Sequence, residues 1–463
     1  MIYIVLTLTT KEIDNMSNVK INFTSITGPV KPMHAVNNGP EPQSVRATSN
    51  FDAYKAARIP YARNHDASFH EGFGGEHIVD VHRIFKNFDA DENDPASYIF
   101  EPTDRYVKST YDAGTKVFYR LGASIEHGYK YGTRVPKDFA KWARICEHII
   151  RHYNEGWADG FEYGIEYWEI WNEVDCRNPD GSSPTWQGTD EEFIEFYCVV
   201  AKYLKSCFPN LKIGGPAFSY PAIDELPVRR NFFVKVKETN TPLDFFSYHC
   251  YANTPQGIRY GAEIGKTILD EMGIKNCETI LDEWNYIKGW LADDWKHSIE
   301  SEQGLKGSSF IAGTMALCQY TSLDMLMYYD ARPCIMCGMF DPGASWNVLK
   351  GYYPFVMFSE LYELGNAVTV DCDDEAICAV AATDGKDCAI MMTHFLDKDN
   401  VEPCEVSLSL ASLPEGKKCV TFYVLDEDND MTLARTEYLS ESNATINLNV
   451  PLYTTYLIKI NVE

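Results

Sequence analysis

Short apolar runs alternate with amphipathic stretches from about residue 33 to residue 330. Eight of these runs predict strands, at residues 33–37, 57–63, 116–121, 167–171, 212–215, 244–248, 278–281 and 325–329. The clearest helical patterns between them cover residues 137–153, 191–207 and 303–321. In the first of these, apolar residues recur every three to four positions, which is typical of one buried helical face. Eight strands alternating with helices favour an α/β fold, a closed (β/α)₈ or TIM barrel, over an open sheet.

The pattern changes after about residue 365, where strand-like runs follow one another without helices between them. These runs lie at residues 376–380, 388–392, 406–410, 420–424 and 456–460. Turn signals such as Asp384-Gly385 separate them, which predicts an accessory antiparallel β-sandwich domain. We expect an N-terminal strand in residues 17–30 to join this sandwich, a catalytic barrel in residues 31–350, and the last barrel helix with the sandwich in residues 351–463.

Residues 1–16 are expected to be a disordered tail or the product of an upstream start. The apolar run at residues 2–8 lacks the positive flank and the cleavage site of an export signal. No run approaches the ~20 apolar residues of a membrane span. The 14 cysteines show no framework spacing, so we expect free thiols, structural ones at Cys334 and Cys337 included. These observations predict a cytoplasmic protein without membrane partners.

Composition narrows the class of partner. Hydrophobic residues make up 45% and charged residues 23% of the chain, which is ordinary for a globular protein and excludes disordered and collagen-like chains. The 41 basic and 67 acidic residues give a formal charge of −26. Such a surface repels phosphate backbones and anionic membranes, so nucleic acid is not an expected partner. Sulfated or carboxylated polyanions are disfavoured for the same reason.

Two carboxylates stand at the ends of predicted strands. Glu173 follows the fourth strand and Glu283 the seventh. Active sites of these barrels lie at the C-terminal strand ends, and strands four and seven face each other across the mouth. A carboxyl pair about 5–5.5 Å apart is the apparatus of retaining glycoside hydrolysis, in which one group donates a proton and the other attacks the anomeric carbon. Asn172 could hydrogen-bond a sugar 2-hydroxyl.

The sequence around these carboxylates resembles the retaining glycosidases of clan A, and most closely glycoside hydrolase family 39, the β-xylosidase and α-L-iduronidase family. The Trp-Asn-Glu signal at residues 171–173 is the most specific part of this resemblance. The segments that carry it are residues 31–40, 61–66, 89–100, 168–175 and 247–251. The resemblance runs from about residue 29 to residue 330, and the sandwich matches only in kind.

The resemblance implies a role for several residues. Glu173 would be the general acid/base and Glu283 the nucleophile. Arg63 would steady the nucleophile electrostatically. Further substrate-binding contacts are implied for His65, His249 and Tyr251.

Two departures from the family concern the sugar. Residues 282–285, Asp-Glu-Trp-Asn, look more like the nucleophile motif of family 51 α-L-arabinofuranosidases than the Thr-Glu-Phe usual in β-xylosidases. On the eighth strand, clan members usually carry Trp where this chain has Tyr328 and Tyr329. We expect Tyr328 to contact substrate. Trp290 could form a sugar platform or pack within its loop.

A polar cluster after strand two is the one place where a metal site is conceivable. It contains His70, His77 and His82 with Glu71, Glu76 and Asp80. No His-Glu-x-x-His or His-x-His order appears there, so we expect no metal and interpret the loop as part of a substrate subsite. Asp330, at the end of strand eight, could bind a hydroxyl or form a salt bridge.

The expected function is that of an exo-acting retaining glycosidase that releases a pentose, β-D-xylose first, from plant-derived oligosaccharides without a cofactor. The alternatives are an α-L-arabinofuranosidase, an enzyme that releases short arabino-oligosaccharides, or another β-glycosidase. A non-catalytic carbohydrate-binding barrel is a further alternative of a different class. Anomeric preference, linkage, exo or endo action and homo-oligomer formation stay open at this point.

Overall fold

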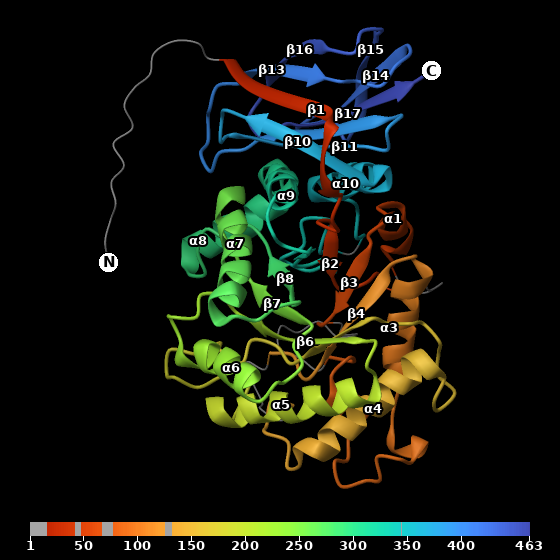
Figure 1. Ribbon diagram of the computed structural model, residues 1–463, viewed down its shortest axis with the longest axis vertical. Coiled ribbons are helices and arrows are strands. Elements are labelled where there is room, and N and C mark those ends of the chain that lie inside the picture. Colours follow the sequence, from red (N-terminus) through yellow and green to blue (C-terminus); the bar gives the residue numbers. More distant parts are fainter. Residues whose placement is uncertain (1–15, 42–47, 67–76, 126–131, 344) are drawn as a thin grey trace.

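The computed structural model describes residues 16–41, 48–66, 77–125, 132–343 and 345–463. Eight strands pair in chain order as parallel neighbours and close into a barrel, which confirms the predicted fold class (Figure 1). The barrel strands are β2 (Ala35–Asn37), β3 (Tyr61–Asn64), β4 (Lys116–Leu121), β5 (Tyr167–Ile170), β6 (Lys212–Phe218), β7 (Phe245–His249), β8 (Glu278–Trp284) and β9 (Met325–Tyr328). The predicted tail up to residue 15 lies outside the described residues.

One predicted strand starts too early. Residues 57–60 are not part of β3, because Ala57 still ends a helix and Pro60 has no N–H to donate to a neighbouring strand. The strand therefore begins at Tyr61, and the carbonyl of Pro60 accepts a hydrogen bond from the backbone of Lys116 on the next strand. The other seven barrel strands overlap their predicted runs, although β2 begins two residues later than predicted and β6 and β8 each extend three residues further.

Helices surround the barrel, and the three helices predicted from the sequence are confirmed as α4, α5 and α9. Asp138 accepts a hydrogen bond from the Lys141 backbone and begins α4, and Gly156 ends it in the left-handed region. Thr189 and Glu192 form a capping box that begins α5. The helices are α1 (Phe51–Ala56), α2 (Val81–Ile84), α3 (Glu101–Asp112), α4 (Phe139–Glu155), α5 (Asp190–Cys207), α6 (Pro227–Glu238), α7 (Pro255–Met272), α8 (Ala292–Glu302), α9 (Leu305–Cys318) and α10 (Tyr353–Leu364), with short 3₁₀ turns at Pro95–Ser97 and Lys350–Tyr352.

An apolar layer fills the N-terminal half of the barrel. It is built from alternate residues of the strands, which point inward while their neighbours face the helices. Its members are Ala35, Phe118, Tyr167, Phe245, Ile280, Met325 and Met327. This layer separates the N-terminal end, where Tyr167, Lys212 and Glu278 bond one another, from the C-terminal end of the barrel.

A second sheet of nine strands forms the accessory domain and confirms the predicted sandwich. The strand order is β15-β14-β17-β12-β11-β10-β1-β13-β16, with β1 antiparallel to β10 and parallel to β13. Strands β10 and β16 were not predicted, nor was β15, which is largely exposed and has no apolar alternation. The strands are β1 (Met16–Pro29), β10 (Asn366–Cys372), β11 (Ile377–Thr383), β12 (Cys388–His394), β13 (Cys404–Ala411), β14 (Lys418–Leu425), β15 (Thr432–Leu439), β16 (Ala444–Val450) and β17 (Thr455–Val462).

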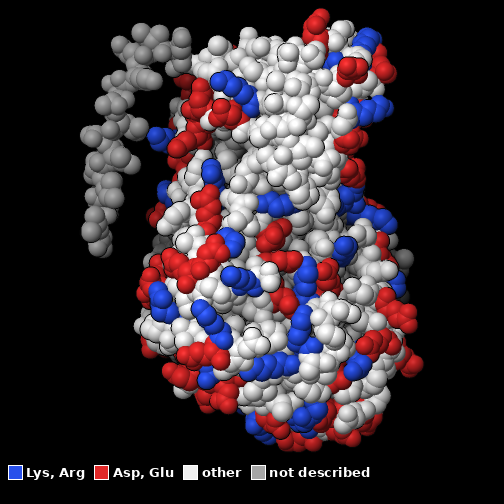
Figure 2. Space-filling view, viewed as in Figure 1, with Lys and Arg blue, Asp and Glu red and all other residues white. Residues whose placement is uncertain are grey.

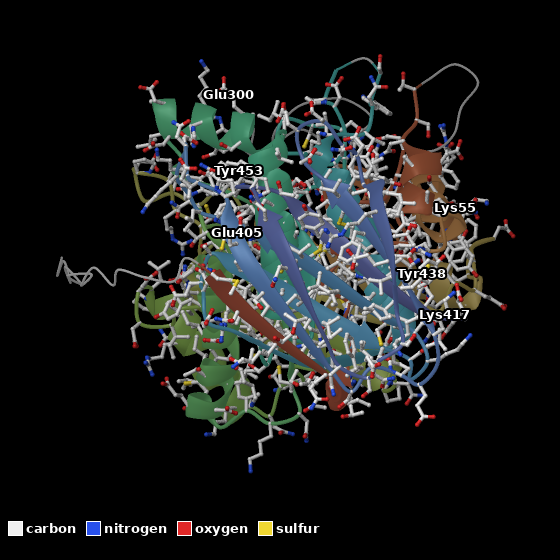
Figure 3. The ribbon with its side chains drawn as sticks, turned by 90° about the horizontal axis from the view of Figure 1, so that it is seen from above. Lys55, Glu300, Glu405, Lys417, Tyr438 and Tyr453 are labelled. Carbon is white, nitrogen blue, oxygen red and sulfur yellow. The ribbon has the colours of Figure 1, made fainter. Side chains whose placement is uncertain are left out.

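Helices α9 and α10 lie between the barrel and the second sheet (Figure 1). Seen from above, the strands of this sheet lie across the helices beneath them, and Lys417 lies over the ring of Tyr438 at the outer edge (Figure 3). Phe310 of α9, Met357 of α10 and Met391 of β12 belong to one continuous hydrophobic core. The two domains therefore share a core. We propose domain boundaries near residues 30 and 350, where the sequence predicts them.

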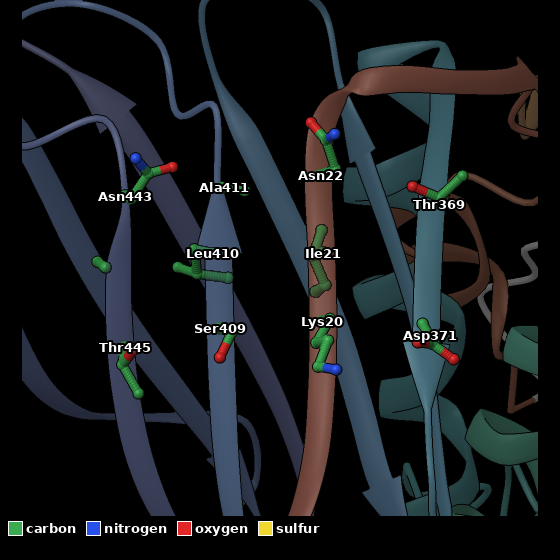
Figure 4. Close-up of a pocket in the computed structure, with 11 residues that line it drawn as sticks. Lys20, Ile21, Asn22, Thr369, Asp371, Ser409, Leu410, Ala411, Asn443 and Thr445 are labelled. Atoms are coloured by element: carbon green, nitrogen blue, oxygen red, sulfur yellow. The ribbon is translucent and has the colours of Figure 1, made fainter.

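The surface differs between the two domains. Acidic and basic side chains cover the barrel, whereas the second-sheet domain shows a broad area without them beside a small cluster of both signs (Figure 2). A hollow of about 540 Å³ opens on this sheet between β1, β10, β13 and β16, lined by side chains such as Asn22, Thr369 and Asn443 (Figure 4). It contains none of the predicted site residues. No helix in the described part of the chain is long and apolar enough to cross a membrane.

Candidate active site

Glu283 lies near the C-terminal end of β8 and is 5% exposed. Arg63 on β3 donates a hydrogen bond from Nη1 to its Oε1 at 2.7 Å, and the Tyr251 hydroxyl donates to its Oε2 at 2.9 Å. Two imidazole nitrogens are close: Nε2 of His65 lies 3.5 Å from Oε1, and Nδ1 of His249 lies 3.4 Å from Oε2. The carboxylate is thus surrounded by donors that stabilise its charged form and fix its direction.

Glu173 follows β5 on the loop that crosses the barrel mouth. Its Oε1 lies 2.8 Å from Nδ1 of His249, the same nitrogen that faces Glu283. Its backbone N–H donates to the carbonyl of Ala217 at 2.8 Å, and its own carbonyl accepts from the Thr185 hydroxyl at 2.6 Å. These bonds hold the loop so that the side chain points toward His249 and Glu283.

The two carboxyl groups are close and differ in proton affinity. Ligand atoms of Glu173, His249 and Glu283 all lie within 4.8 Å of one another. Burial, reinforced by the negative charge of Asp175, raises the pKa of Glu173 to about 8. Burial also raises the pKa of Glu283, but only to about 7, because His249 and Arg63 oppose the shift. Between these values Glu283 is ionised while Glu173 keeps its proton, so one group can attack and the other can donate.

Arg63 connects the polar groups beneath the mouth. Its Nε donates to Glu169 at 2.6 Å and its Nη2 to Asn172 at 2.7 Å, in addition to the bond with Glu283. Burial lowers the pKa of this guanidinium, but the charges of Glu169 and its neighbours outweigh burial and raise it. Arg63 and Asn172 thus lie together, and Glu169 is a site residue that the sequence did not reveal. Glu169 lies two residues after Tyr167 of the apolar layer on β5, so its side chain also points into the barrel.

His65 is held in one orientation by a second arginine. Arg120 donates from Nε to Nδ1 of His65 at 3.0 Å, so the imidazole proton lies on Nε2. Burial lowers the pKa of His65 well below its usual value, which keeps the ring neutral. Nε2 lies 3.2 Å from Oδ1 of Asp66, whose Oδ2 accepts a bond from the Tyr329 hydroxyl at 2.5 Å. His65 therefore presents an N–H to the space above Glu283.

The structure corrects the prediction for Tyr328. This residue is fully buried on the outer face of β9, where its ring packs against Trp284 and Phe355, and its hydroxyl accepts a bond from Gly338 at 3.0 Å. Met325 and Met327 face the barrel interior, so strand alternation turns Tyr328 outward and Tyr329 inward. The tyrosine that reaches the site is Tyr329, which directly follows β9 and donates a hydrogen bond to Asp66.

Trp290 lies at the rim of the site. Its side chain is 56% exposed, and its ring meets that of Tyr251 edge to face at 5.1 Å. On its other side it stacks against Trp295 at 5.5 Å. Tyr251 bonds the carboxylate of Glu283, so only Tyr251 lies between the Trp290 ring and that carboxylate. The Trp290 ring could support a sugar at the entrance of the site.

Local backbone irregularities bring these groups together. Trp171 and Glu173 adopt φ values of 77° and 46°, in the left-handed region that L-residues avoid and that is concentrated at functional sites. Pairing of β8 with β9 shifts register between Leu281 and Trp284. Neighbouring residues of a regular strand face opposite ways, and such a shift allows both Asp282 and Glu283 to face the site.

Of the residues that could hold a metal, the described part of the chain offers one group, Glu173, His249 and Glu283. These atoms already face one another, because Nδ1 of His249 lies 2.8 Å from Glu173 and 3.4 Å from Glu283. In the predicted polar cluster, Asp80 accepts a bond from Arg120 at 2.6 Å, and His77 lies 3.9 Å from Asp66. His70, Glu71 and Glu76 lie outside the described residues. Asp330 forms the expected salt bridge, with Arg332 at 2.8 Å.

Comparison with known proteins agrees with this geometry. Residues 64–286 match the model of the family described as glycosyl hydrolases family 39. The predicted resemblance to family 39 is confirmed. Two curated β-xylosidases, from Caldicellulosiruptor saccharolyticus and Geobacillus stearothermophilus, are 28% and 26% identical over 165 and 185 residues. These alignments cover 34% and 37% of this chain, and the chain spans only 31% and 34% of those two relatives.

Solved structures confirm the fold over nearly the whole chain. A glucosidase from Croceicoccus marinus superimposes with a TM-score of 0.77 at 22% identity, over 97% of this chain and 99% of that one. A monomeric β-xylosidase from Caulobacter crescentus gives 0.69 at 15% identity, over 96% and 99% of the two chains. An α-L-arabinofuranosidase from Thermotoga maritima gives 0.63 at 13% identity, over 96% and 99%. The barrel and the second sheet therefore occur together in these proteins as well.

Proposed function

We propose that the protein is a retaining, exo-acting glycosidase that releases a pentose, with β-D-xylose as the expected sugar, from plant-derived oligosaccharides. The observation that carries the proposal is the pair Glu173 and Glu283, with carboxylate oxygens within 4.8 Å of each other. Retaining glycosidases have carboxyl groups about 5–5.5 Å apart, whereas inverting enzymes need about 6.5–9.5 Å to admit a water. The short separation supports double displacement.

In the first step, Glu283 attacks the anomeric carbon while the proton of Glu173 passes to the leaving oxygen. The glycosidic C–O bond breaks, an ester bond to Glu283 forms, and Glu173 is left ionised. In the second step, Glu173 takes a proton from water, whose oxygen attacks the same carbon and releases Glu283. The sugar leaves with its original anomeric configuration, and both carboxyl groups return to their starting protonation states. No cofactor takes part.

The surrounding groups serve this cycle in distinct ways. Arg63 and Tyr251 orient Glu283 through bonds of 2.7 and 2.9 Å, and burial beside Glu283 raises the pKa of Tyr251 far enough to keep its hydroxyl protonated. Burial lowers the pKa of His249, so this ring is neutral and can pass a hydrogen bond between the two carboxyl groups as their charges change. We assign His65 and Asn172 to sugar hydroxyls and Trp290 to the leaving-group side.

The site favours a neutral sugar. The three arginines around it are already paired with carboxylates: Arg63 with Glu169 and Glu283, Arg120 with Asp80, and Arg332 with Asp330. Asp66 stays ionised despite its burial, because the Arg332 guanidinium and the hydrogen bond from the Tyr329 hydroxyl lower its pKa, and it adds negative charge close to Glu283. A uronic acid would bring a further carboxylate to this place. Together with the formal charge of −26, this disfavours an iduronidase.

Xylose is supported by the two β-xylosidase relatives, and arabinofuranose is the second candidate. The Asp-Glu-Trp-Asn motif at residues 282–285 favours the latter. Its tryptophan, however, is fully buried on the outer face of β8 against Phe310 and Tyr328, away from the mouth. Trp284 therefore does not contact the sugar, and the motif says less about substrate than its resemblance suggests. Other β-glycosides and a purely sugar-binding role are outcomes that the test below separates.

The test is a set of initial rates on aryl glycosides with the same leaving group. We expect β-D-xylopyranoside to be cleaved with a higher kcat/KM than α-L-arabinofuranoside, β-D-glucopyranoside or β-D-galactopyranoside. A preference for the arabinofuranoside would overturn the sugar assignment and leave the mechanism in place. Binding of xylose without turnover of any glycoside would make the barrel a binding module. Glu283→Gln removes the proposed nucleophile. Its matched control is Glu278→Gln, at the opposite end of β8, which should keep activity.

We also propose a cytoplasmic location. It is supported by the cysteines, because all 14 are free thiols in the structure and none forms a disulfide. Free thiols in this number are typical of a reducing compartment. Cys334 and Cys337 are part of this set and pack beside the site without a bond between them.

A further inference from the structure

Asp282 is a buried carboxyl group without an evident donor. It lies on β8 next to Glu283 and is completely shielded from solvent. Neither of its carboxylate oxygens accepts a hydrogen bond from the described residues. Nε of Arg63 lies 3.1 Å from its Oδ2, but that N–H already donates to Glu169 at 2.6 Å. Carboxylates in such surroundings are strongly destabilised unless they are paired or take up a proton.

The charges around Asp282 do not balance if every acid is ionised. Arg63 on β3 faces Glu169 on β5 and both Asp282 and Glu283 on β8. One guanidinium would then oppose three carboxylates in a space that excludes water. Asn37 on β2 adds no charge; its amide oxygen accepts from Arg63 at 3.0 Å and its Nδ2 donates to the backbone carbonyl of Asp282 at 2.5 Å.

His249 on β7 does not supply the missing positive charge. Its Nε2 lies 3.7 Å from Oδ1 of Asp282, beyond hydrogen-bond distance, and its Nδ1 is engaged by Glu173 at 2.8 Å. Burial lowers the pKa of this imidazole, which keeps it neutral. Burial and the neighbouring charge of Glu169 raise the pKa of Asp282 well above its usual value. A proton is the remaining way to reduce the charge.

We propose that Asp282 and Glu169 hold one proton between them and together carry a single negative charge. Both carboxyl groups lie at Nε of Arg63, with oxygens at 3.1 and 2.6 Å. Glu169 is also within hydrogen-bonding reach of Asp282, which adds to the raised pKa of Asp282. The pair then offsets the charge of Arg63 once, and Glu283 can ionise without facing two further carboxylates. Asp282 is thus a positioning residue that acts through Arg63 on the nucleophile. The inference rests on the proposed function in that Glu283 must work ionised.

Substitution by amides tests the proton count. Asp282→Asn copies the shape and the neutral charge of a protonated acid, and Glu169→Gln does the same for the other partner. In each single variant the remaining carboxyl group keeps the pair at one negative charge. The acid limb of the kcat/KM profile, which reports ionisation of Glu283, should therefore stay within about 0.3 pH unit of the wild type. The double variant removes the charge and should move that limb to lower pH by roughly one to two units.

Each other pattern overturns the proposal. If either single variant moves the acid limb down, both carboxyl groups are ionised in the native protein. If the double variant leaves it in place, the pair carries no charge. A purely structural role would reduce kcat or stability without this pattern of limb positions.

A second readout does not depend on turnover. The infrared carbonyl band of buried protonated carboxyl groups at pH 7 should lose intensity equally in Asp282→Asn and in Glu169→Gln, while Asp324→Asn at the other end of the barrel should retain it. An unchanged band in both pair variants would contradict the shared proton. This band is informative even if the protein cleaves no glycoside, so failure of this inference and failure of the proposed function can be told apart.

Discussion

At the scale of single residues, the site separates two identical functional groups by their surroundings. Glu283 is buried and receives hydrogen bonds from Arg63 and Tyr251, whereas Glu173 is partly buried and faces the negative charge of Asp175. Hydrogen bonds and positive charge stabilise an ionised carboxylate, and a nearby negative charge favours the protonated form. This asymmetry supports the proposed roles, in which Glu283 is the nucleophile and Glu173 the acid.

The asymmetry predicts the pH dependence of the enzyme. Below a pH of about 7 Glu283 takes up a proton and stops attacking, and above about 8 Glu173 loses the proton that it must donate. We therefore expect a narrow bell-shaped profile of kcat/KM with its maximum between these values. The profile is measured on an alkyl xyloside, whose poor leaving group needs the acid. A plateau that extends above pH 9 would contradict the role of Glu173.

Substitution of Asp175 should move only the basic limb of the kcat/KM profile. Its Oδ2 accepts a bond from Nε of Arg229 at 2.7 Å, and its charge raises the pKa of Glu173. Asp175→Asn removes that charge while keeping the shape, so the pKa of Glu173 falls. The basic limb should move to lower pH by roughly half to one unit while the acid limb stays in place. Equal movement of both limbs would show that Asp175 does not act on Glu173 selectively.

At the scale of elements, the alternation of side chains along the barrel strands determines which residues face the site. The exceptions are residues that an irregular backbone turns toward it. The sequence predicts seven of the eight barrel strands at their observed positions, together with the two carboxylates at the strand ends. It did not separate Tyr328 from Tyr329, because a tyrosine pair carries no apolar–polar contrast to indicate the inward side. It also missed Glu169 and Asp282, since charged residues inside a barrel contradict the hydrophobic pattern used to find strands.

Close contacts between strands predict which glycine cannot change. A Cβ added to Gly214 of β6 would lie 2.3 Å from the backbone carbonyl of Phe245 on β7, and a backbone atom cannot move aside cheaply. Gly214→Ala should therefore destabilise the protein by about 1–3 kcal/mol, read from urea unfolding. Gly304→Ala is the control, because its nearest atoms would lie at 3.6 Å. Similar stabilities of the two variants would contradict the tight packing of β6 on β7.

At the scale of the whole molecule, the second sheet supports the loops that carry the site. Its Asp397 lies after β12, accepts bonds from Tyr286 at 2.7 Å and Asn253 at 2.6 Å, and pairs with Lys306. Tyr286 follows the nucleophile strand by two residues, and Asn253 follows β7. Because the barrel and the second sheet also share one hydrophobic core, we expect both to unfold together in a single calorimetric transition.

Loss of Asp397 should weaken this support. Asp397→Ala leaves the Tyr286 hydroxyl, the Asn253 amide and the Lys306 ammonium without their shared acceptor, so stability should fall by about 1–3 kcal/mol and kcat with it. Asp399→Ala, two residues along the same loop at an exposed position, serves as the matched control. Two separate transitions in either protein, or full activity of Asp397→Ala, would show that the second sheet does not brace the site.

The proposed mechanism requires that Glu283 form a covalent bond with the sugar. The protein is incubated with an activated 2-deoxy-2-fluoro-β-D-xyloside. Its fluorine slows both steps but slows release of the sugar more, so the intermediate accumulates. Mass spectrometry of the intact protein should then show one added fluoroxylosyl group, and peptide mapping should place it on Glu283. Activity should return as the adduct hydrolyses. A stable adduct on another residue, or turnover of the reagent by an enzyme whose mass never changes, would contradict the account.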